Sequence, residues 1–164
     1  MNYIKNLKKG FTLVEMLVVI SLIGILAALA LVSFASTQKQ ARDTQRKSDL
    51  RQYQNALEAY ANLSSGLYPE FSAVRVASTT LCTSLNSKIE PDISCSEDPK
   101  SATNGTYSYI SDGTGTSGTA TATKYVIWGK LENSSSTTYW VICSTGKIGS
   151  YVSASAPSSA TCPI

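Results

Sequence analysis

A long uncharged run near the N-terminus constrains this chain more than any other feature. Residues 16–38 contain no Asp, Glu, Lys or Arg, a stretch of 23 residues. As a helix, this run would be about 35 Å long, enough to cross the hydrocarbon core of a bilayer, which is about 30 Å thick. Lys5, Lys8 and Lys9 precede it, and lysines flanking a span favour the cytoplasmic side. We therefore expect a single-pass segment in the cytoplasmic membrane, with the N-terminus inside.

The composition argues against several classes of function. The chain has no histidine, which excludes a Ser-His-Asp or Cys-His site and any metal site built on histidine. No nucleophile has a visible base and no phosphate-binding loop is present, so we do not expect an enzyme. The formal net charge of +3 equals the charge of the three lysines before Gly10, so it gives little support for nucleic-acid binding.

Three interpretations of the N-terminus compete at this point. A secretory signal peptide could be cut near Ala28-Leu29-Ala30, but its apolar core would be about 7–15 residues long, shorter than this run. A plain membrane anchor is the second. The third depends on the spacing of Gly10, Phe11 and Glu15. An ionised carboxylate inside hydrocarbon is costly, so Glu15 is a functional candidate unless it is solvated at the headgroup level.

The segment Lys8-Lys9-Gly10-Phe11-Thr12-Leu13-Val14-Glu15 resembles the leader and cleavage site of bacterial type IV prepilins and type II secretion pseudopilins. The resemblance covers about residues 5–60. It implies cleavage after Gly10 by a prepilin peptidase and N-methylation of the new first residue, Phe11. It also implies that Glu15 pairs with the N-terminal amine of Phe11 in a neighbouring subunit during assembly.

The same resemblance divides the chain into four parts. Residues 1–10 would be the leader peptide, 11–38 the hydrophobic helix of the membrane and the fibre core, 39–63 an amphipathic half-helix, and 64–164 a β-rich head. The sequence itself predicts one continuous helix over about 12–63, ended by Gly66 and Pro69. One face of its second half carries apolar residues spaced by three or four positions, which predicts docking onto a sheet: Leu50, Tyr53, Leu57 and Tyr60.

The first half of this helix suits both a membrane and a fibre. Small residues permit close helix packing, and Gly24 weakens a helix by about 1 kcal/mol relative to alanine. Family members often have proline where this chain has Val32, so any flexible point is expected near Gly24. Residues 39–51 carry five basic and two acidic side chains. We expect a solvated polar face there, or alternatively contacts with acidic heads of neighbouring subunits or with lipid headgroups.

The head is rich in Ser, Thr, Gly, Asn and Tyr. Its β-rich runs predict strands at 106–110, 124–131 and 138–143, with a fourth at 148–152, and a short helix near 78–88. The expected fold class is therefore α+β and type IV pilin-like, with the long helix packed on an antiparallel sheet of three or four strands.

The head also holds four cysteines. Outside the cell these can pair in three ways, and proximity in the sequence favours Cys82–Cys95 and Cys143–Cys162. We expect no cofactor or metal. One acidic cluster is a candidate for calcium binding, but solvated loop acids are the preferred interpretation: Asp92, Glu97 and Asp98.

The resemblance implies a structural subunit of a type IV pilus, inserted in the cytoplasmic membrane and then polymerised into an extracellular filament for adhesion, motility or DNA uptake. The expected partners are copies of the same chain, a prepilin peptidase, the membrane, and an assembly platform protein with its ATPase. Nucleic acid would be a partner only for a DNA-uptake pilus. A pseudopilin of a type II secretion or competence machine and a single membrane-anchored adhesin are the alternatives.

Overall fold

The computed structural model describes residues 10–89, 93–101 and 105–164, with only the backbone described at 30–33. It divides the chain into two compact units, Met1–Gln38 and Lys39–Ile164. One helix, α1 (Leu13–Asn62), runs through the boundary between these two units. The predicted helix over 12–63 is thus confirmed to within one residue at each end. The helix is followed by Ser65 and Gly66 with positive φ values of 56° and 80°, and the Gly66 N–H donates to the carbonyl of Ala61 at 2.8 Å, which satisfies a carbonyl at the helix end.

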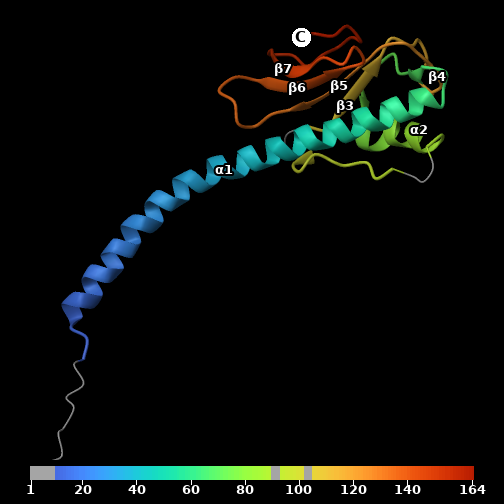
Figure 1. Cartoon of the computed structure of the whole chain (residues 1–164). Helices are drawn as coiled ribbons and strands as arrows, with labels where there is room; N and C mark the ends of the chain where they lie inside the picture. The colour runs from blue at the N-terminus through green and yellow to red at the C-terminus, as the bar shows by residue number, and fades with distance from the viewer. Residues whose placement is uncertain (1–9, 90–92, 102–104) are drawn as a thin grey trace, which may run out of the picture. The chain divides into compact units, whose positions relative to one another are not determined.

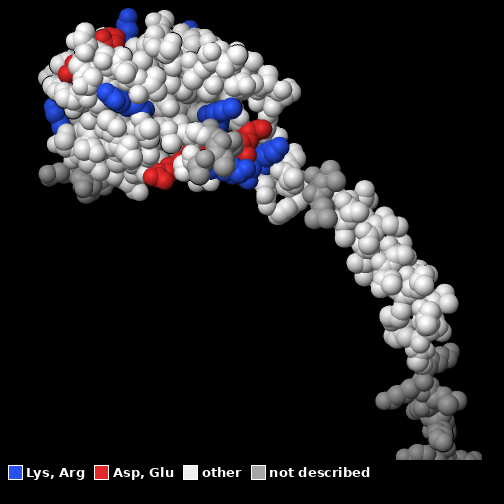
Figure 2. Space-filling view, turned by 180° about the vertical axis from the view of Figure 1, so that it is seen from behind, with Lys and Arg blue, Asp and Glu red and all other residues white. Residues whose placement is uncertain are grey.

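The described part of the N-terminal unit is, from Leu13 onward, a mostly apolar helix. Phe11 is 80% exposed, Ile25 60% and Leu29 69%, and the visible face of this segment in Figure 2 carries no charged atoms. α1 is the one helix among the described residues that is long and apolar enough to cross a membrane. The sequence carries no charged residue at 16–38, so no face of this part of the helix is suited to water.

The C-terminal unit is built on an antiparallel sheet, and Figure 1 shows the second half of α1 lying along it. Its strands follow the order β2-β3-β5-β6-β7. A separate pair joins β1 (Tyr68–Pro69) to β4 (Ala120–Ala122). The five strands of the main sheet are β2 (Arg75–Val76), β3 (Ser108–Ser111), β5 (Tyr125–Lys130), β6 (Thr138–Cys143) and β7 (Ile148–Val152).

The prediction of three or four strands was therefore too low for the main sheet. The four predicted strands are present, but β2 adds a fifth by pairing Arg75 with Tyr109 and Val76 with Ser108. A strand of two residues is too short to show the alternation by which strands are recognised in a sequence. The position of β2 in the sheet is instead determined by its pairing with β3.

The core lies between α1 and one face of this sheet. The predicted stripe of Leu50, Tyr53, Leu57 and Tyr60 is at most 3% exposed. Tyr53 packs edge-on against Tyr107, with ring centroids 6.1 Å apart. A side chain at Gly129 would come within 3.0 Å of Tyr107 and 3.4 Å of Leu50, so glycine allows the helix and the sheet to approach closely here.

Alternate residues of β5 and β6 point to the other face of the sheet. There Val126, Trp128, Val141 and Cys143 form a second apolar cluster, which Cys162 and Ile164 partly cover. The predicted short helix near 78–88 is also present, as a π-helical turn at Ala77–Leu81 followed by α2 (Cys82–Asn86).

Candidate functional site

The first turn of α1 brings Thr12 and Glu15 together. The backbone N–H and the hydroxyl of Thr12 both donate to Oε2 of Glu15, each at 2.8 Å, and the Glu15 N–H donates to Oγ1 of Thr12 at 3.2 Å. This reciprocal arrangement is a capping box, which satisfies N–H groups that a helix start leaves without partners. Glu15 therefore has a structural role inside its own chain, as part of this cap. The sequence analysis missed this role, although the T-x-x-E spacing indicates a capping box.

The predicted cleavage residues lie just before this helix. Gly10 and Phe11 are exposed and precede the first helical residue, Leu13, so the Gly10–Phe11 bond is in an accessible, non-helical position. The leader residues 1–9 lie outside the described residues. Cleavage after Gly10 and methylation of Phe11 remain predictions.

Gly24 lies within an uninterrupted helix. The structure has α1 helical on both sides of it, and an added Cβ at this position would meet nothing within 4 Å. A local loss of helix near Gly24 on assembly stays a prediction, and its physical reason is the lower helix propensity of glycine.

The charged part of α1 at 39–51 departs from the sequence prediction. Arg46 is completely buried, and Asp43 and Asp49 are only 6% and 5% exposed. The expectation of a solvated polar face is therefore wrong for these side chains. The partners come from segments 50 to 90 residues away in the sequence, which the local pattern cannot show.

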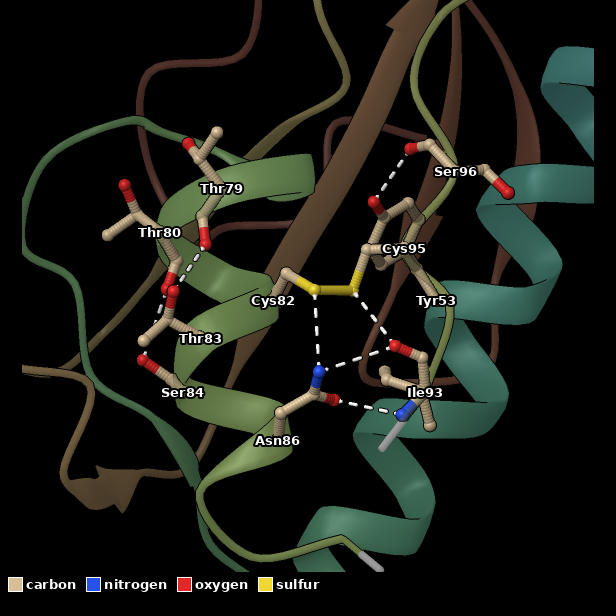
Figure 3. The surroundings of a disulfide bond; sticks show 10 residues. All are labelled: Tyr53, Thr79, Thr80, Cys82, Thr83, Ser84, Asn86, Ile93, Cys95 and Ser96. Atoms are coloured by element: carbon tan, nitrogen blue, oxygen red, sulfur yellow. Dashed lines mark hydrogen bonds between the residues drawn. A yellow bond between two sulfur atoms is a disulfide. The ribbon is translucent and has the colours of Figure 1, made fainter. Parts of the chain in front are cut away.

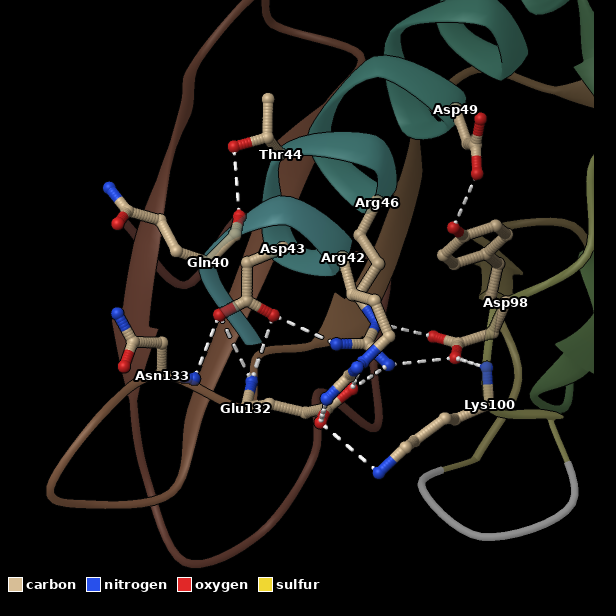
Figure 4. A network of polar contacts seen from close by, with 11 residues as sticks. Gln40, Arg42, Asp43, Thr44, Arg46, Asp49, Asp98, Lys100, Glu132 and Asn133 are labelled. Atoms are coloured by element: carbon tan, nitrogen blue, oxygen red, sulfur yellow. Dashed lines mark hydrogen bonds and ion pairs between the residues drawn. The ribbon is translucent and has the colours of Figure 1, made fainter. Parts of the chain in front are cut away.

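Arg46 is the centre of a buried charge cluster, drawn in Figure 4. Its Nε and Nη2 atoms donate to the two carboxylate oxygens of Asp98 at 2.7 and 2.9 Å. Nη1 donates to Asp43 at 2.8 Å, and Nη2 lies 2.6 Å from Oε1 of Glu132. One guanidinium thus holds α1, the segment after α2 and the turn after β5 together, using the planar donor geometry in which arginine exceeds lysine.

Each carboxylate of the cluster has further partners. Arg42 binds Glu132 through two parallel hydrogen bonds of 2.9 and 2.6 Å, and Nζ of Lys100 lies 3.5 Å from Glu132. The Asp43 carboxylate accepts the backbone N–H groups of Glu132 and Asn133. Hydrogen bonding from Arg42 keeps the pKa of Glu132 well below its ordinary range. Burial by itself would lower the pKa of Arg46, but the hydrogen bonds from Arg46 to its carboxylate partners outweigh burial and raise this pKa.

Asp98, one of the three acidic residues considered as calcium ligands, belongs to this charge cluster. Asp98 is bound by Arg46 and accepts the backbone N–H of Lys100 at 2.7 Å. Glu97 is exposed, and Asp92 lies outside the described residues. The carboxylate of Asp98 is therefore committed to a protein cation, which disfavours its use as a calcium ligand.

Two disulfides cross-link the head. Cys82–Cys95 joins α2 to the segment beside α1, where the Tyr53 hydroxyl donates to the carbonyl of Ser96 at 2.7 Å (Figure 3). Cys143–Cys162 ties the C-terminal loop to β6. This is the connectivity that proximity in the sequence favours.

Comparisons with known proteins agree with these features. The family model described as the prokaryotic N-terminal methylation motif matches residues 5–31. The type IV major pilin protein PilA of Myxococcus xanthus is 35% identical over 52 residues, 32% of this chain and 24% of that protein. The type II secretion system core protein G of Pseudomonas aeruginosa is 40% identical over 62 residues, 38% of this chain and 43% of that protein.

A third relative, the type IV major fimbrial protein FimA of Dichelobacter nodosus, is 37% identical over 54 residues, 33% of this chain and 35% of that protein. The chain therefore spans less than half the length of these curated relatives. No solved structure matches it with comparable significance.

The long helix is apolar in its first half and packs on an antiparallel sheet with its second half, and a methylation motif lies at its start, an arrangement that fits a type IV pilin-like fold. The motif and the relatives support assignment of the chain to the type IV pilin and pseudopilin family. These relatives are structural subunits rather than enzymes, in agreement with the sequence analysis. The apolar helix and the motif fit both a membrane-anchored precursor and a filament.

Proposed function

We propose that this chain is the subunit of a type IV pilus. In this proposal it is inserted in the cytoplasmic membrane, cut after Gly10 by a prepilin peptidase and methylated at Phe11. A platform protein and an ATPase then help to polymerise it through its N-terminal helix into an extracellular filament.

The observation that carries this proposal is the exposed apolar helix of the N-terminal unit. Its large side chains, from Phe11 to Phe34, are between 45% and 80% exposed where the structure describes them. Leaving about ten such side chains in water would cost about 15–30 kcal/mol, at about 1.5–3 kcal/mol each. That is more than the whole stability of a typical domain. The helix therefore needs lipid or other helices around it, and copies of the same helix that meet head to tail without closing form an open filament.

The hydrogen bonds of Glu15 leave one of its carboxylate oxygens available for a contact between subunits. Both hydrogen bonds from Thr12 go to Oε2, and in the described part of the chain no hydrogen bond to Oε1 is present. Cleavage would create a positive amine at Phe11, and Oε1 of a neighbouring subunit could accept it while the capping box stays intact. Such a pair fixes the register of subunits more than it adds stability.

A substitution series separates the two roles of Glu15. Glu15→Gln keeps a side-chain oxygen for the capping box, since glutamine also serves there, but removes the charge. Thr12→Ala weakens the cap and keeps the charge. We expect Glu15→Gln to slow filament formation about as much as Glu15→Val, and Thr12→Ala to assemble close to the wild-type rate. Wild-type assembly by Glu15→Gln would refute the charge pairing.

A pseudopilin is the second candidate, because core protein G of type II secretion is among the relatives and the match spans a larger share of that protein than of the pilins. The two disulfides, and the commitment of Asp98 and Glu132 to arginine rather than to calcium, favour the pilus.

Mass analysis of the N-terminus of sheared surface material tests the proposal. The pilus account predicts abundant protein that begins with a methylated Phe11. A chain that begins with methylated Phe11 but is absent from surface fibres would favour the pseudopilin. Uncut Gly10–Phe11 would favour a single anchored adhesin and contradict both assembly accounts.

A further inference from the structure

A basic hollow lies in the head beside the charge cluster. It has a volume of about 430 Å³ and is lined by Lys39, Lys100 and Lys130, together with Glu132 and the turn segment at 134–137. Lys39 and Lys130 are exposed, and neither forms an ion pair within the residues that the structure describes. Figure 2 shows basic and acidic atoms side by side on the head, with much of its remaining visible surface uncharged.

The charges around this hollow do not cancel. Glu132 is its one acidic lining residue, and Arg42 and Arg46 already bind that carboxylate. The other two acids of the cluster, Asp43 and Asp98, are held by Arg46. Lys100 lies 3.5 Å from Glu132, which leaves Lys39 and Lys130 as the surplus positive charge. The hollow is therefore suited to an anion.

The sequence places this hollow at the end of the membrane span. Lys39 is the first charged residue after the uncharged run at 16–38. In an inserted chain, a lysine at this position lies at the boundary between hydrocarbon and water, where its long side chain reaches the headgroups. Because Lys39 also lines the hollow, at least this lining residue is within reach of lipid phosphates.

We propose that this hollow, formed by Lys39, Lys100, Lys130 and the turn at 134–137, binds the phosphate of an anionic phospholipid headgroup while the subunit is in the membrane. The inference rests on the membrane-inserted stage of the proposed function. Each lysine near an anionic surface contributes about fivefold to binding. The bound headgroup fixes the head close to the bilayer and is released when the helix leaves the lipid.

The test uses the full chain inserted into nanodiscs that contain phosphatidylcholine with a minor share of phosphatidylglycerol. Native mass spectrometry then reports which lipids stay on the protein. We expect enrichment of phosphatidylglycerol, and a drop of about fivefold per lysine in the double variant Lys39→Gln/Lys130→Gln. The matched control, Lys124→Gln/Lys147→Gln, removes the same charge from two exposed lysines outside the hollow and should retain the enrichment.

The other outcomes are distinguishable. A chain that fails to insert contradicts the membrane stage of the proposed function and the inference with it. A chain that inserts but retains both lipids equally overturns the inference alone. Displacement of phosphatidylglycerol by an equal concentration of inorganic phosphate would identify a free-phosphate site. Unchanged lipid retention with slower filament assembly in the double variant would assign the hollow to an acidic surface of a neighbouring subunit. Each of these last two results overturns the headgroup proposal.

Discussion

Replacement of Arg46 by methionine should destabilise the head severely, because it removes the cation from three buried carboxylates. Breaking a buried ion pair by removing one partner costs about 3–5 kcal/mol. Here Glu132 would keep Arg42 and Lys100, and Asp43 would keep two backbone N–H donors. Asp43 and Asp98 would both lose the arginine that binds them, but Asp98 also keeps a backbone N–H donor, that of Lys100, so we expect a loss near the lower end, about 3 kcal/mol. A domain of this size is stabilised by about 5–15 kcal/mol in total.

Urea unfolding of the full chain in neutral detergent, followed by the fluorescence of Trp128 and Trp140, measures this loss. Arg51→Met is the matched control, because Arg51 is an exposed arginine on the same helix. We expect its free energy of unfolding to differ from wild type by less than about 0.5 kcal/mol, as for most surface substitutions.

The pH dependence gives a second readout for the same variant. The pKa of Glu132 is lowered on folding by hydrogen bonds from Arg42 and also by Arg46. The part due to Arg46 is missing in the variant, and in the wild type it contributes stability that is present above the unfolded pKa of about 4.5 and is lost as the pH falls below that value. The difference between wild type and Arg46→Met should therefore narrow in acid. A loss no larger than that of Arg51→Met, or one that does not change with pH, would refute the reasoning.

Three further predictions concern the rest of the head. Replacing both Cys143 and Cys162 by serine should lower the free energy of unfolding by about 3 kcal/mol, measured by urea unfolding. Burial raises the pKa of Tyr68 from 10 to about 12, so this contribution to stability is present below pH 10 and is lost between pH 10 and 12; the phenolate absorbance of Tyr68, taken as the difference between wild type and Tyr68→Phe, should rise together with unfolding rather than before it. Gly118→Ala should lower the melting temperature more than Gly146→Ala, because both glycines have positive φ but only a side chain at Gly118 would collide with its neighbours; equal shifts would contradict this.

The sequence was sufficient for the regular parts of the fold. The helix at 13–62 and the longer strands follow from runs whose periodicity is long enough to read, and the stripe from Leu50 to Tyr60 correctly identifies the packed face. The short strands β1, β2 and β4 have only two or three residues each, too few to show a periodicity of their own, and their positions depend on the strands with which they pair.

The charged residues of α1 show what a local sequence pattern cannot predict. Asp43 and Arg46 have the spacing of a helical ion pair, but such a pair looks the same in a sequence whether it is solvated or buried. Burial is decided by Asp98 and Glu132, which lie 52 and 86 residues beyond Arg46. The capping box of Thr12 and Glu15 is different, since its signal, the T-x-x-E spacing, is local and can be recognised in the sequence.

The central claim is that the apolar helix exchanges lipid for copies of itself, and the accessibility of Ile25 in isolated fibres tests it most directly. Since the structure holds all four cysteines in disulfides, a single introduced cysteine is the one thiol that can react. We predict that Ile25→Cys in sheared fibres resists a water-soluble maleimide, whereas Thr116→Cys, on the exposed surface of the head, is labelled rapidly. Labelling of Ile25→Cys as fast as Thr116→Cys in intact fibres would contradict the account.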